Sequence, residues 1–413
     1  MPQVFSGGWL YLFIIVMAIC IIRIWIKIGT IQSEAPMNRP VIKVTPFVKS
    51  ETEPDPKSEV SSLLGATDDL IKQGAHTEAL GRLEAFLENL SPTEDREVRG
   101  MVLFRIAACH SRLAVGGERF QYLLRAGEAL REAVRLFTPV RYRDHYLRAL
   151  SELAGLYEDL ARGRNPVGNY NQSARTCETA ATAAREGELS LPEAMFLARS
   201  GNAYRQLVRH AEPQVNLRKA VDAYEKALAI LEGSEDENAV SRSMKIFKVL
   251  GDTYTDLAKY FQKTESLFHA VNAYENALGI MDENGPSMER SFVLMVLSRV
   301  LLELYDDEKS PAHLRRALRC SRSAMDEAKE SDNLILKGMS MAVMGDALMR
   351  YAEYKDRLEN LKRAVKLYET ALGIIKDGEE PALREEIREN LGEAVQKISG
   401  VGEGAHEGWG EKT

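Results

Sequence analysis

Residues that could carry out chemistry are scattered along this chain of 413 residues. None of the seven histidines has a second histidine or a carboxylate at a spacing that would hold a metal ion. The sequence has no GxxxxGK[ST] phosphate loop, no G-x-S-x-G nucleophile motif and no HExxH motif. The acidic run from Asp306 to Glu308 is predicted to be a solvated turn between helices. We therefore expect no catalytic site, no metal and no cofactor, and predict that the chain is not an enzyme.

Arginine, which favours bidentate contacts with carboxylate or phosphate, is concentrated in one part of the chain. Residues 96–164 contain thirteen arginines, no lysine and eight acidic residues, although the whole chain has a net charge of -7. The candidate basic patch consists of Arg141, Arg143, Arg148, Arg162 and Arg164. An acidic peptide, a phosphorylated partner or lipid headgroups would fit such a patch, and ordinary helix-surface ion pairs are the alternative. A nucleic acid partner is not expected.

Two series of small residues indicate an internal repeat. Alanines at 126, 174, 220, 270, 317 and 364 recur every 46 to 50 residues. About 19 residues before each lies another small residue, at 108, 155, 201, 251, 298 and 345, and a seventh follows at Gly392. Apolar residues at helical spacing surround both series. Each repeat is therefore predicted to be a hairpin of two long helices, the first carrying the small residue and the second the alanine.

The repeats resemble the tetratricopeptide family, on the evidence of two motifs. The first helix has a small residue three before an aromatic, as in Gly201/Tyr204 and Gly251/Tyr254. The second helix has the pattern Ala-x3-aromatic-x2-Ala, as in Ala220/Tyr224/Ala227, Ala270/Tyr274/Ala277 and Ala364/Tyr368/Ala371. The resemblance covers roughly residues 93 to 398, with a period near 47 where the family usually has 34. It implies an all-α, right-handed superhelical solenoid of antiparallel helix hairpins.

The resemblance also implies a ligand groove lined by the first helices. Its positions lie three residues before the small residue and one, four and five after it. Transferred to this sequence, the partner-binding groove comprises Asn202, Arg205, Lys248, Asp252, Asp256, Arg299, Glu303, Asp346 and Arg350. The solvated face of surface helices is the alternative explanation for these polar residues. The family's carboxylate clamp is incomplete here, so binding of chaperone tails is not predicted.

The amino-terminal segment is predicted to be a transmembrane anchor, residues 1–29. Trp9–Ile28 is mostly apolar and about as long as a membrane-spanning helix. A cleaved signal peptide is the rival interpretation, but no basic segment precedes the apolar run and no small-x-small site follows it. Lys and Arg follow the span and none precedes it, so the repeats are expected in the cytoplasm of a single-pass membrane protein. The cysteines show no pairing pattern, which agrees with a cytoplasmic location of the repeats.

The remaining segments complete the predicted organisation. Residues 30–57 contain five prolines and are predicted to be a flexible linker. Residues 58–398 form the repeat domain, which begins with an atypical hairpin near 58–90 and ends with a polar capping helix. Residues 399–413 are glycine-rich and are expected to be disordered.

Together these features predict a membrane-anchored scaffold for protein–protein interaction. It would recruit a protein or peptide partner of unknown identity through a concave groove. Self-association through an end repeat is a further alternative. One alternative is an envelope-side assembly factor whose repeats lie outside the cytoplasm. The other is a regulatory subunit of a membrane enzyme that contacts an anionic substrate or lipid.

Overall fold

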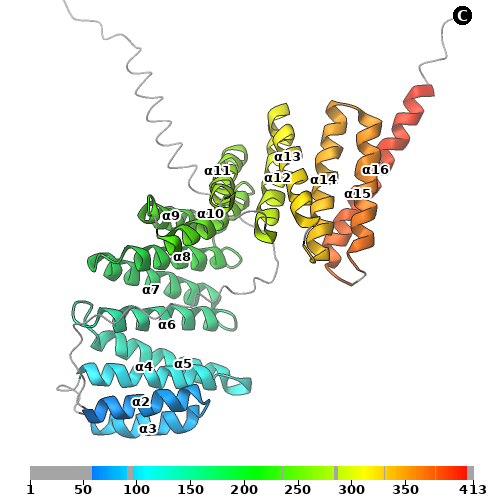
Figure 1. The fold of residues 1–413 in the computed structure, drawn as a ribbon. Helices are drawn as coiled ribbons and strands as arrows, with labels where there is room; N and C mark the ends of the chain where they lie inside the picture. Colours follow the sequence, from blue (N-terminus) through cyan, green and yellow to red (C-terminus); the bar gives the residue numbers. More distant parts are fainter. Residues whose placement is uncertain are drawn as a thin grey trace, which may run out of the picture. The chain divides into compact units, whose positions relative to one another are not determined.

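The computed structural model describes residues 58–90, 96–234, 236–282, 287–329, 331–376 and 378–406. These residues form fifteen α-helices and one short 3-10 helix, and no β-strand occurs among them (Figure 1). The predicted membrane anchor and linker, residues 1–57, lie outside the described part. Among the helices that are described, none is both long and apolar enough to cross a membrane. The predicted all-helical repeat fold is confirmed.

The helices follow one another along the chain with short connections. They are α2 (Ser58–Lys72), α3 (His76–Asn89), α4 (Arg96–Leu113), η1 (Gly116–Glu118), α5 (Arg119–Leu136), α6 (Arg143–Ala161), α7 (Pro166–Glu186), α8 (Ser190–Leu207), α9 (Pro213–Leu231), α10 (Glu237–Leu257), α11 (Lys263–Asp282), α12 (Met288–Glu308), α13 (Pro311–Lys329), α14 (Leu334–Tyr354), α15 (Arg357–Ile374) and α16 (Pro381–His406).

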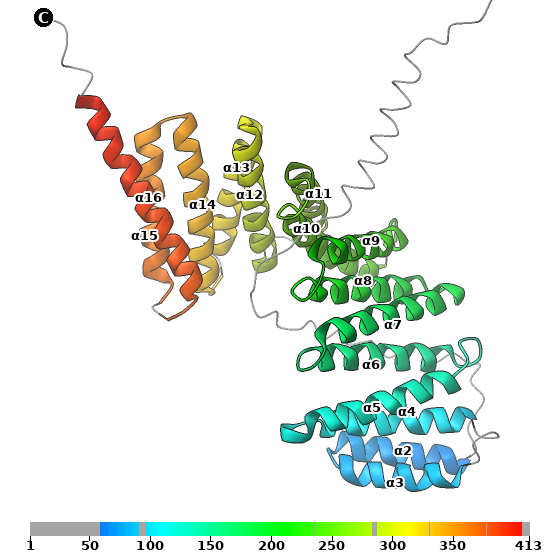
Figure 2. The ribbon, with the colours of Figure 1, turned by 180° about the vertical axis from the view of Figure 1, so that it is seen from behind.

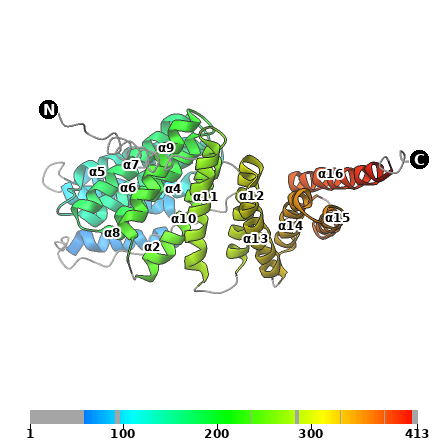
Figure 3. The same cartoon turned by 90° about the horizontal axis from the view of Figure 1, so that it is seen from above.

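The described helices divide into two compact units after Ser234, where the sequence predicts one continuous repeat domain. The amino-terminal unit contains α2 to α9 and the carboxy-terminal unit contains α10 to α16. In both units consecutive helices pack side by side as antiparallel hairpins, which is clearest from behind for α6 to α9 (Figure 2). Figure 3 shows the same pairing of α12 with α13 from above. We call the even-numbered helices first helices and the odd-numbered ones second helices.

The alanine series and the small residues at 201, 251, 298 and 345 lie at the contact between the two helices of a hairpin, whereas Ala108 and Gly155 are half-buried and Gly392 is exposed. All six alanines of the second helices, at 126, 174, 220, 270, 317 and 364, have no exposed surface. In the first helices Gly201 and Gly251 are buried as well. A larger side chain at these positions would hold the two helices apart, so the spacing of the small residues sets where the hairpin closes.

A left-handed residue precedes several second helices. Glu212, Gln262 and Asp356 have positive φ angles of 39°, 34° and 47° directly before α9, α11 and α15. Non-glycine residues rarely adopt this conformation, and it costs about 1–3 kcal/mol when they do. The recurrence of this turn at the same point shows that these three hairpins share one connection geometry.

The carboxy-terminal helix α16 continues past the predicted domain boundary at residue 398. It ends at His406, eight residues into the segment predicted as a disordered tail, and residues 407–413 lie outside the description. A helix that is already formed adds one hydrogen bond for each further residue, so it can continue through glycines that would not start one.

Candidate docking surface

The glycines of the first helices receive tyrosine rings from the second helices. A Cβ atom at Gly201 would lie 2.7 Å from the ring of Tyr224, and one at Gly251 would lie 2.7 Å from the ring of Tyr274. Gly345 and Tyr368 repeat the contact at 2.6 Å. These distances are too short for any side chain, so each tyrosine lies in a notch that only glycine can form.

The tyrosine hydroxyls donate hydrogen bonds to three of the predicted groove residues. Tyr224 donates to Asn202 Oδ1 at 2.7 Å, Tyr274 to Asp252 Oδ1 at 2.8 Å and Tyr368 to Asp346 Oδ1 at 2.7 Å. Each acceptor directly follows the glycine of the notch. The residues that the resemblance assigns to a ligand at this position therefore hold the hairpins closed.

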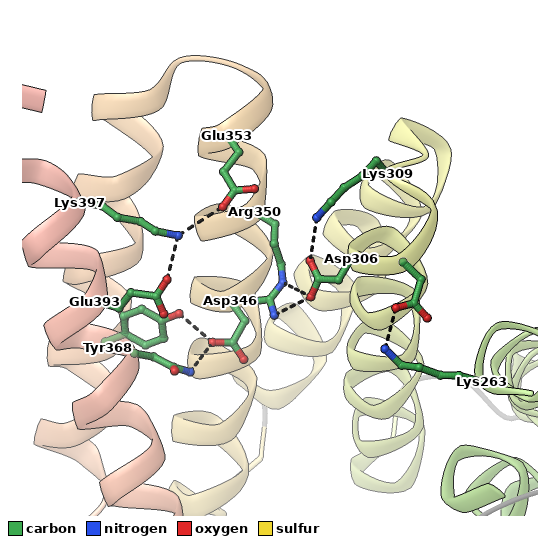
Figure 4. A network of polar contacts seen from close by, with 11 residues as sticks. Lys263, Asp306, Lys309, Asp346, Arg350, Glu353, Tyr368, Glu393 and Lys397 are labelled. Carbon is green, nitrogen blue, oxygen red and sulfur yellow. Dashed lines mark hydrogen bonds and ion pairs between the residues drawn. The ribbon is translucent and has the colours of Figure 1, made fainter. Parts of the chain in front are cut away.

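Three further groove residues form ion pairs with another first helix. Lys248 on α10 contacts Glu289 on α12 at 2.5 Å. Arg350 on α14 donates two hydrogen bonds to Asp306 Oδ2, at 3.2 and 3.0 Å (Figure 4). Arg299 on α12 pairs with Glu386 on α16. These ion pairs join the first helices of the carboxy-terminal unit into one surface.

The other predicted groove residues are divided between core and surface. Asp256 is 1% exposed and accepts a hydrogen bond from Lys259 at 2.9 Å. Arg205 is half-buried on α8, whereas Glu303 is exposed on α12. The nine residues thus do not form a single solvated groove.

The prediction that residues 306–308 form a loop was wrong. They belong to the last turn of α12, where Asp306 binds Arg350 and Asp307 accepts a hydrogen bond from Lys263 at 2.7 Å. Acidic residues at a helix carboxy terminus oppose the helix dipole, and these partners supply the compensating positive charge. The third acidic residue, Glu308, lies 2.9 Å from His313.

A network of polar side chains fixes α16 to α14 (Figure 4). Asp346 is 7% exposed and accepts a second hydrogen bond, from Asn390 on α16, at 2.9 Å. Lys397 bridges Glu393 at 2.8 Å and Glu353 at 3.3 Å. Burial, followed by the Asp346 carboxylate, raises the pKa of Tyr368 far above its ordinary value. The space among these residues is about 220 Å³, and the charged side chains that line it are paired with one another. We therefore interpret the network as a structural contact that holds the helices together.

The predicted basic patch is divided between the two ends of α6. Arg141, Arg143 and Arg148 lie at its start, whereas Arg162 and Arg164 follow its end. The helix of 19 residues is about 28 Å long, and Arg148, which lies within it, is still 14 residues or about 21 Å from Arg162 along the axis. Several of these side chains contact their own unit: Arg148 lies over the ring of Phe104, Arg164 lies over Phe120, and Arg162 pairs with Asp159. The structure does not bring the five arginines together.

A hollow of about 430 Å³ lies on the first helices of the carboxy-terminal unit, and of the predicted groove residues only Lys248 lines it. Its lining is Lys248, Met288, Glu289, Phe292, Asn333, Ile335, Leu336 and Met339. Ser287 and Asn333 cap α12 and α14 by accepting hydrogen bonds from the backbone N–H groups of Arg290 and Leu336, both at 3.0 Å. These caps place the apolar lining in the first turns of both helices.

The apolar side chains of the hollow occupy equivalent positions in two successive repeats. Met288 and Ile335 lie ten residues before the small residues at 298 and 345, and Phe292 and Met339 lie six before them. Met288 is 54% exposed and Phe292 is 40% exposed, which is unusual for large apolar groups arranged around a hollow. This recurring pair was the available sequence signal, but the family's ligand positions lie further along the helix.

Metal ligands are not grouped in the part of the chain that the structure describes. No three His, Cys, Asp or Glu side chains among those residues lie close enough to share an ion. The described cysteines are reduced, and burial raises the pKa of Cys177 to about 12.

Comparison with known proteins gives remote structural likenesses only. No family model and no curated protein sequence matches the chain. One similar solved structure is PH0952 from Pyrococcus horikoshii, described as a Signal Transduction ATPase with Numerous Domains (STAND) protein with a tetratricopeptide repeat sensor. It is 14% identical over 82% of this chain and 50% of its own, with a TM-score of 0.41, so this chain spans half the length of that protein.

Two other similar structures cover most of their own length. BtubC from P. vanneervenii is 17% identical over 67% of this chain and 92% of its own, with a TM-score of 0.36. The TPR2AB domain of yeast Sti1, in complex with pHSP90, is 16% identical over 70% and 98%, with a TM-score of 0.24. All three scores lie below 0.5 and carry no argument about partners. The all-helical repeat fold of this chain is described by its own hairpins and tyrosine notches.

Proposed function

We propose that the carboxy-terminal unit docks a protein or peptide partner, which inserts bulky apolar side chains into the hollow between α12 and α14. The observation that carries this proposal is the exposure of Met288 and Phe292 around a hollow of about 430 Å³. Removal of apolar surface from water contributes about 25 cal/mol per Å², so a partner gains most by covering these side chains. Methionine adapts its shape to different apolar groups, which suits a docking surface.

The docking surface replaces the polar groove as the proposed binding site. Most of the polar groove residues already have intramolecular partners, and a ligand would have to displace those partners. The apolar hollow requires no such exchange. The chain in this proposal is a scaffold that binds without catalysing a reaction.

The proposal includes a membrane tether at the amino terminus. The apolar length of Trp9–Ile28 supports it, together with the basic residues that follow and the proline-rich segment 30–57. A tether would raise the local concentration of the partner at the membrane, so that modest contacts suffice for recruitment. We place the repeats in the cytoplasm, and a reporter fused at Lys57 distinguishes this orientation from an envelope-side one.

Residue-specific photo-cross-linking tests the docking surface. A photoreactive amino acid replaces Phe292 in the full-length chain, expressed in its native cells. The matched control places it at Phe268 on α11, which is also apolar and is 37% exposed, but lies outside the hollow. A defined protein adduct at position 292 that is absent at position 268 is expected. Equal adducts at both positions, or none at 292, would remove the hollow as a binding site.

A further inference from the structure

The first helices on the two sides of the hollow, α10 and α16, carry opposite charges at equivalent positions of the repeat. The position six residues before the small residue is Lys245 on α10, Phe292 on α12, Met339 on α14 and Glu386 on α16. The position three residues before the small residue is Lys248 on α10 and Glu389 on α16, and the residues between them in this row, Met295 and Ala342, are apolar and buried. At these equivalent positions the side chains thus change from basic on α10, through apolar on α12 and α14, to acidic on α16.

Several of these charges are available to a partner. Lys245 and Glu389 are exposed, Arg242 is half-buried, and none of the three has an ion-pair partner among the described residues. Lys248 and Glu386 do have partners, in Glu289 and Arg299. Free positive charge therefore remains on the α10 side of the hollow, and free negative charge remains on the α16 side.

We infer that the docked partner is an extended, charge-polarised peptide segment whose acidic residues face α10, whose bulky apolar residues fill the hollow, and whose basic residues face α16. This inference rests on the proposed function, since it names the partner chemistry of that docking surface. Opposite charges at the two ends of the segment would set the direction in which it lies, and the apolar centre would supply most of the binding free energy.

The length of the segment follows from helix packing. Packed helices lie about 8–10 Å apart, and α10 is joined to α12 by the Lys248–Glu289 ion pair without close packing, so three steps from α10 to α16 span at least about 25–30 Å. An extended chain advances about 3.3 Å per residue, which gives a segment of roughly eight or nine residues. A charged residue near each end and two or three large apolar residues near the centre would match the surface.

Selection from a random peptide library tests the inference without knowledge of the natural partner. The full-length protein in detergent selects from displayed 12-residue peptides, and the affinities of the enriched peptides are measured by fluorescence anisotropy. We expect enriched sequences with an acidic end, an apolar centre and a basic end. The double variant Arg242→Glu and Lys245→Glu should weaken their binding at least fivefold, and the loss should shrink at high salt. The control Lys362→Glu, at an exposed site on α15 outside the hollow, should leave binding unchanged.

The outcomes separate this inference from the proposed function. Peptides whose binding is weakened in Phe292→Ser, but which show no charge polarity and bind the double variant normally, would overturn the inference and leave the docking surface in place. Peptides that bind Phe292→Ser normally would overturn both. Selection by the double variant of peptides with basic residues at both ends, because the α10 side and the α16 side are then both acidic, would support the inference most directly.

Discussion

The tyrosine notches predict that the substitution Tyr→Phe destabilises the protein by a different amount at each notch, according to the burial and charge of the hydrogen-bond acceptor. The change removes a hydroxyl and leaves the ring in its notch. At Tyr368 the lost bond is to Asp346, a carboxylate that is 7% exposed, at 2.7 Å. Hydrogen bonds to charged groups contribute about 1.5–3 kcal/mol, and the penalty persists because a buried charge is left with one acceptor site unsatisfied. We therefore expect Tyr368→Phe to destabilise its unit by about 2–3 kcal/mol.

The same substitution elsewhere provides internal controls. At Tyr224 the acceptor is Asn202, which is neutral and exposed, so the loss should be only about 0.5–1.5 kcal/mol. Tyr274, whose acceptor Asp252 is charged but half-buried, should fall between them. Urea unfolding followed by far-ultraviolet circular dichroism measures the free energies, with hydrogen exchange of α14 and α15 as a local readout. Equal losses at Tyr224 and Tyr368 would refute the reasoning that partner burial and charge set the cost.

Three further predictions concern stability. Gly251→Ala should lower the free energy of unfolding by about 1–3 kcal/mol, because its Cβ would lie 2.7 Å from the Tyr274 ring. Gly392→Ala should raise it by about 0.5–1 kcal/mol, because this helix residue on α16 has no atom within 4 Å of the added Cβ. Urea titrations of both variants would show changes of opposite sign. Glu212→Asn should raise stability by up to about 1 kcal/mol, because asparagine tolerates the left-handed conformation before α9 and can cap the helix; a decrease in melting temperature would contradict this. Burial raises the pKa of Cys177 from 9.0 to about 12, so the thiol of the unfolded chain ionises at lower pH and the free energy of unfolding should fall as pH rises from 9 to 12. Cys177→Ala should flatten that decline when unfolding is measured at several pH values. An unchanged slope would exclude the thiol as its cause.

The repeat fold could be predicted from sequence because its main determinants are local and periodic. Ala220, Ala270 and Ala364 recur with a tyrosine four residues later, and a glycine precedes each alanine by 19 residues. Small residues at a fixed spacing on both helices of a hairpin have few uses other than close packing. The division after Ser234 has no such signal in the alanine and glycine series, which continue across it.

The binding surface could not be predicted in the same way. Asp252 and Asp346 occupy positions that the family uses for ligands, and periodicity alone does not reveal that a tyrosine hydroxyl reaches each of them. Arg350 and Asp306 are 44 residues apart, and their pairing depends on how successive first helices pack. Helical spacing also cannot distinguish Phe292, which is 40% exposed, from an apolar residue of the core. The hollow therefore required the three-dimensional arrangement of α12 and α14.

The central claim, that the hollow docks a partner, is tested most directly by affinity. Once cross-linking has identified the partner, its dissociation constant is measured for the full-length chain, for Phe292→Ser and for Phe268→Ser. Complete burial of a phenylalanine side chain contributes about 1.5–3 kcal/mol, and Phe292 is 40% exposed, so covering the rest should contribute about 1 kcal/mol. The account predicts that Phe292→Ser weakens binding about three- to eightfold while Phe268→Ser leaves it unchanged. Unchanged binding by Phe292→Ser, with the fold intact by circular dichroism, would contradict it.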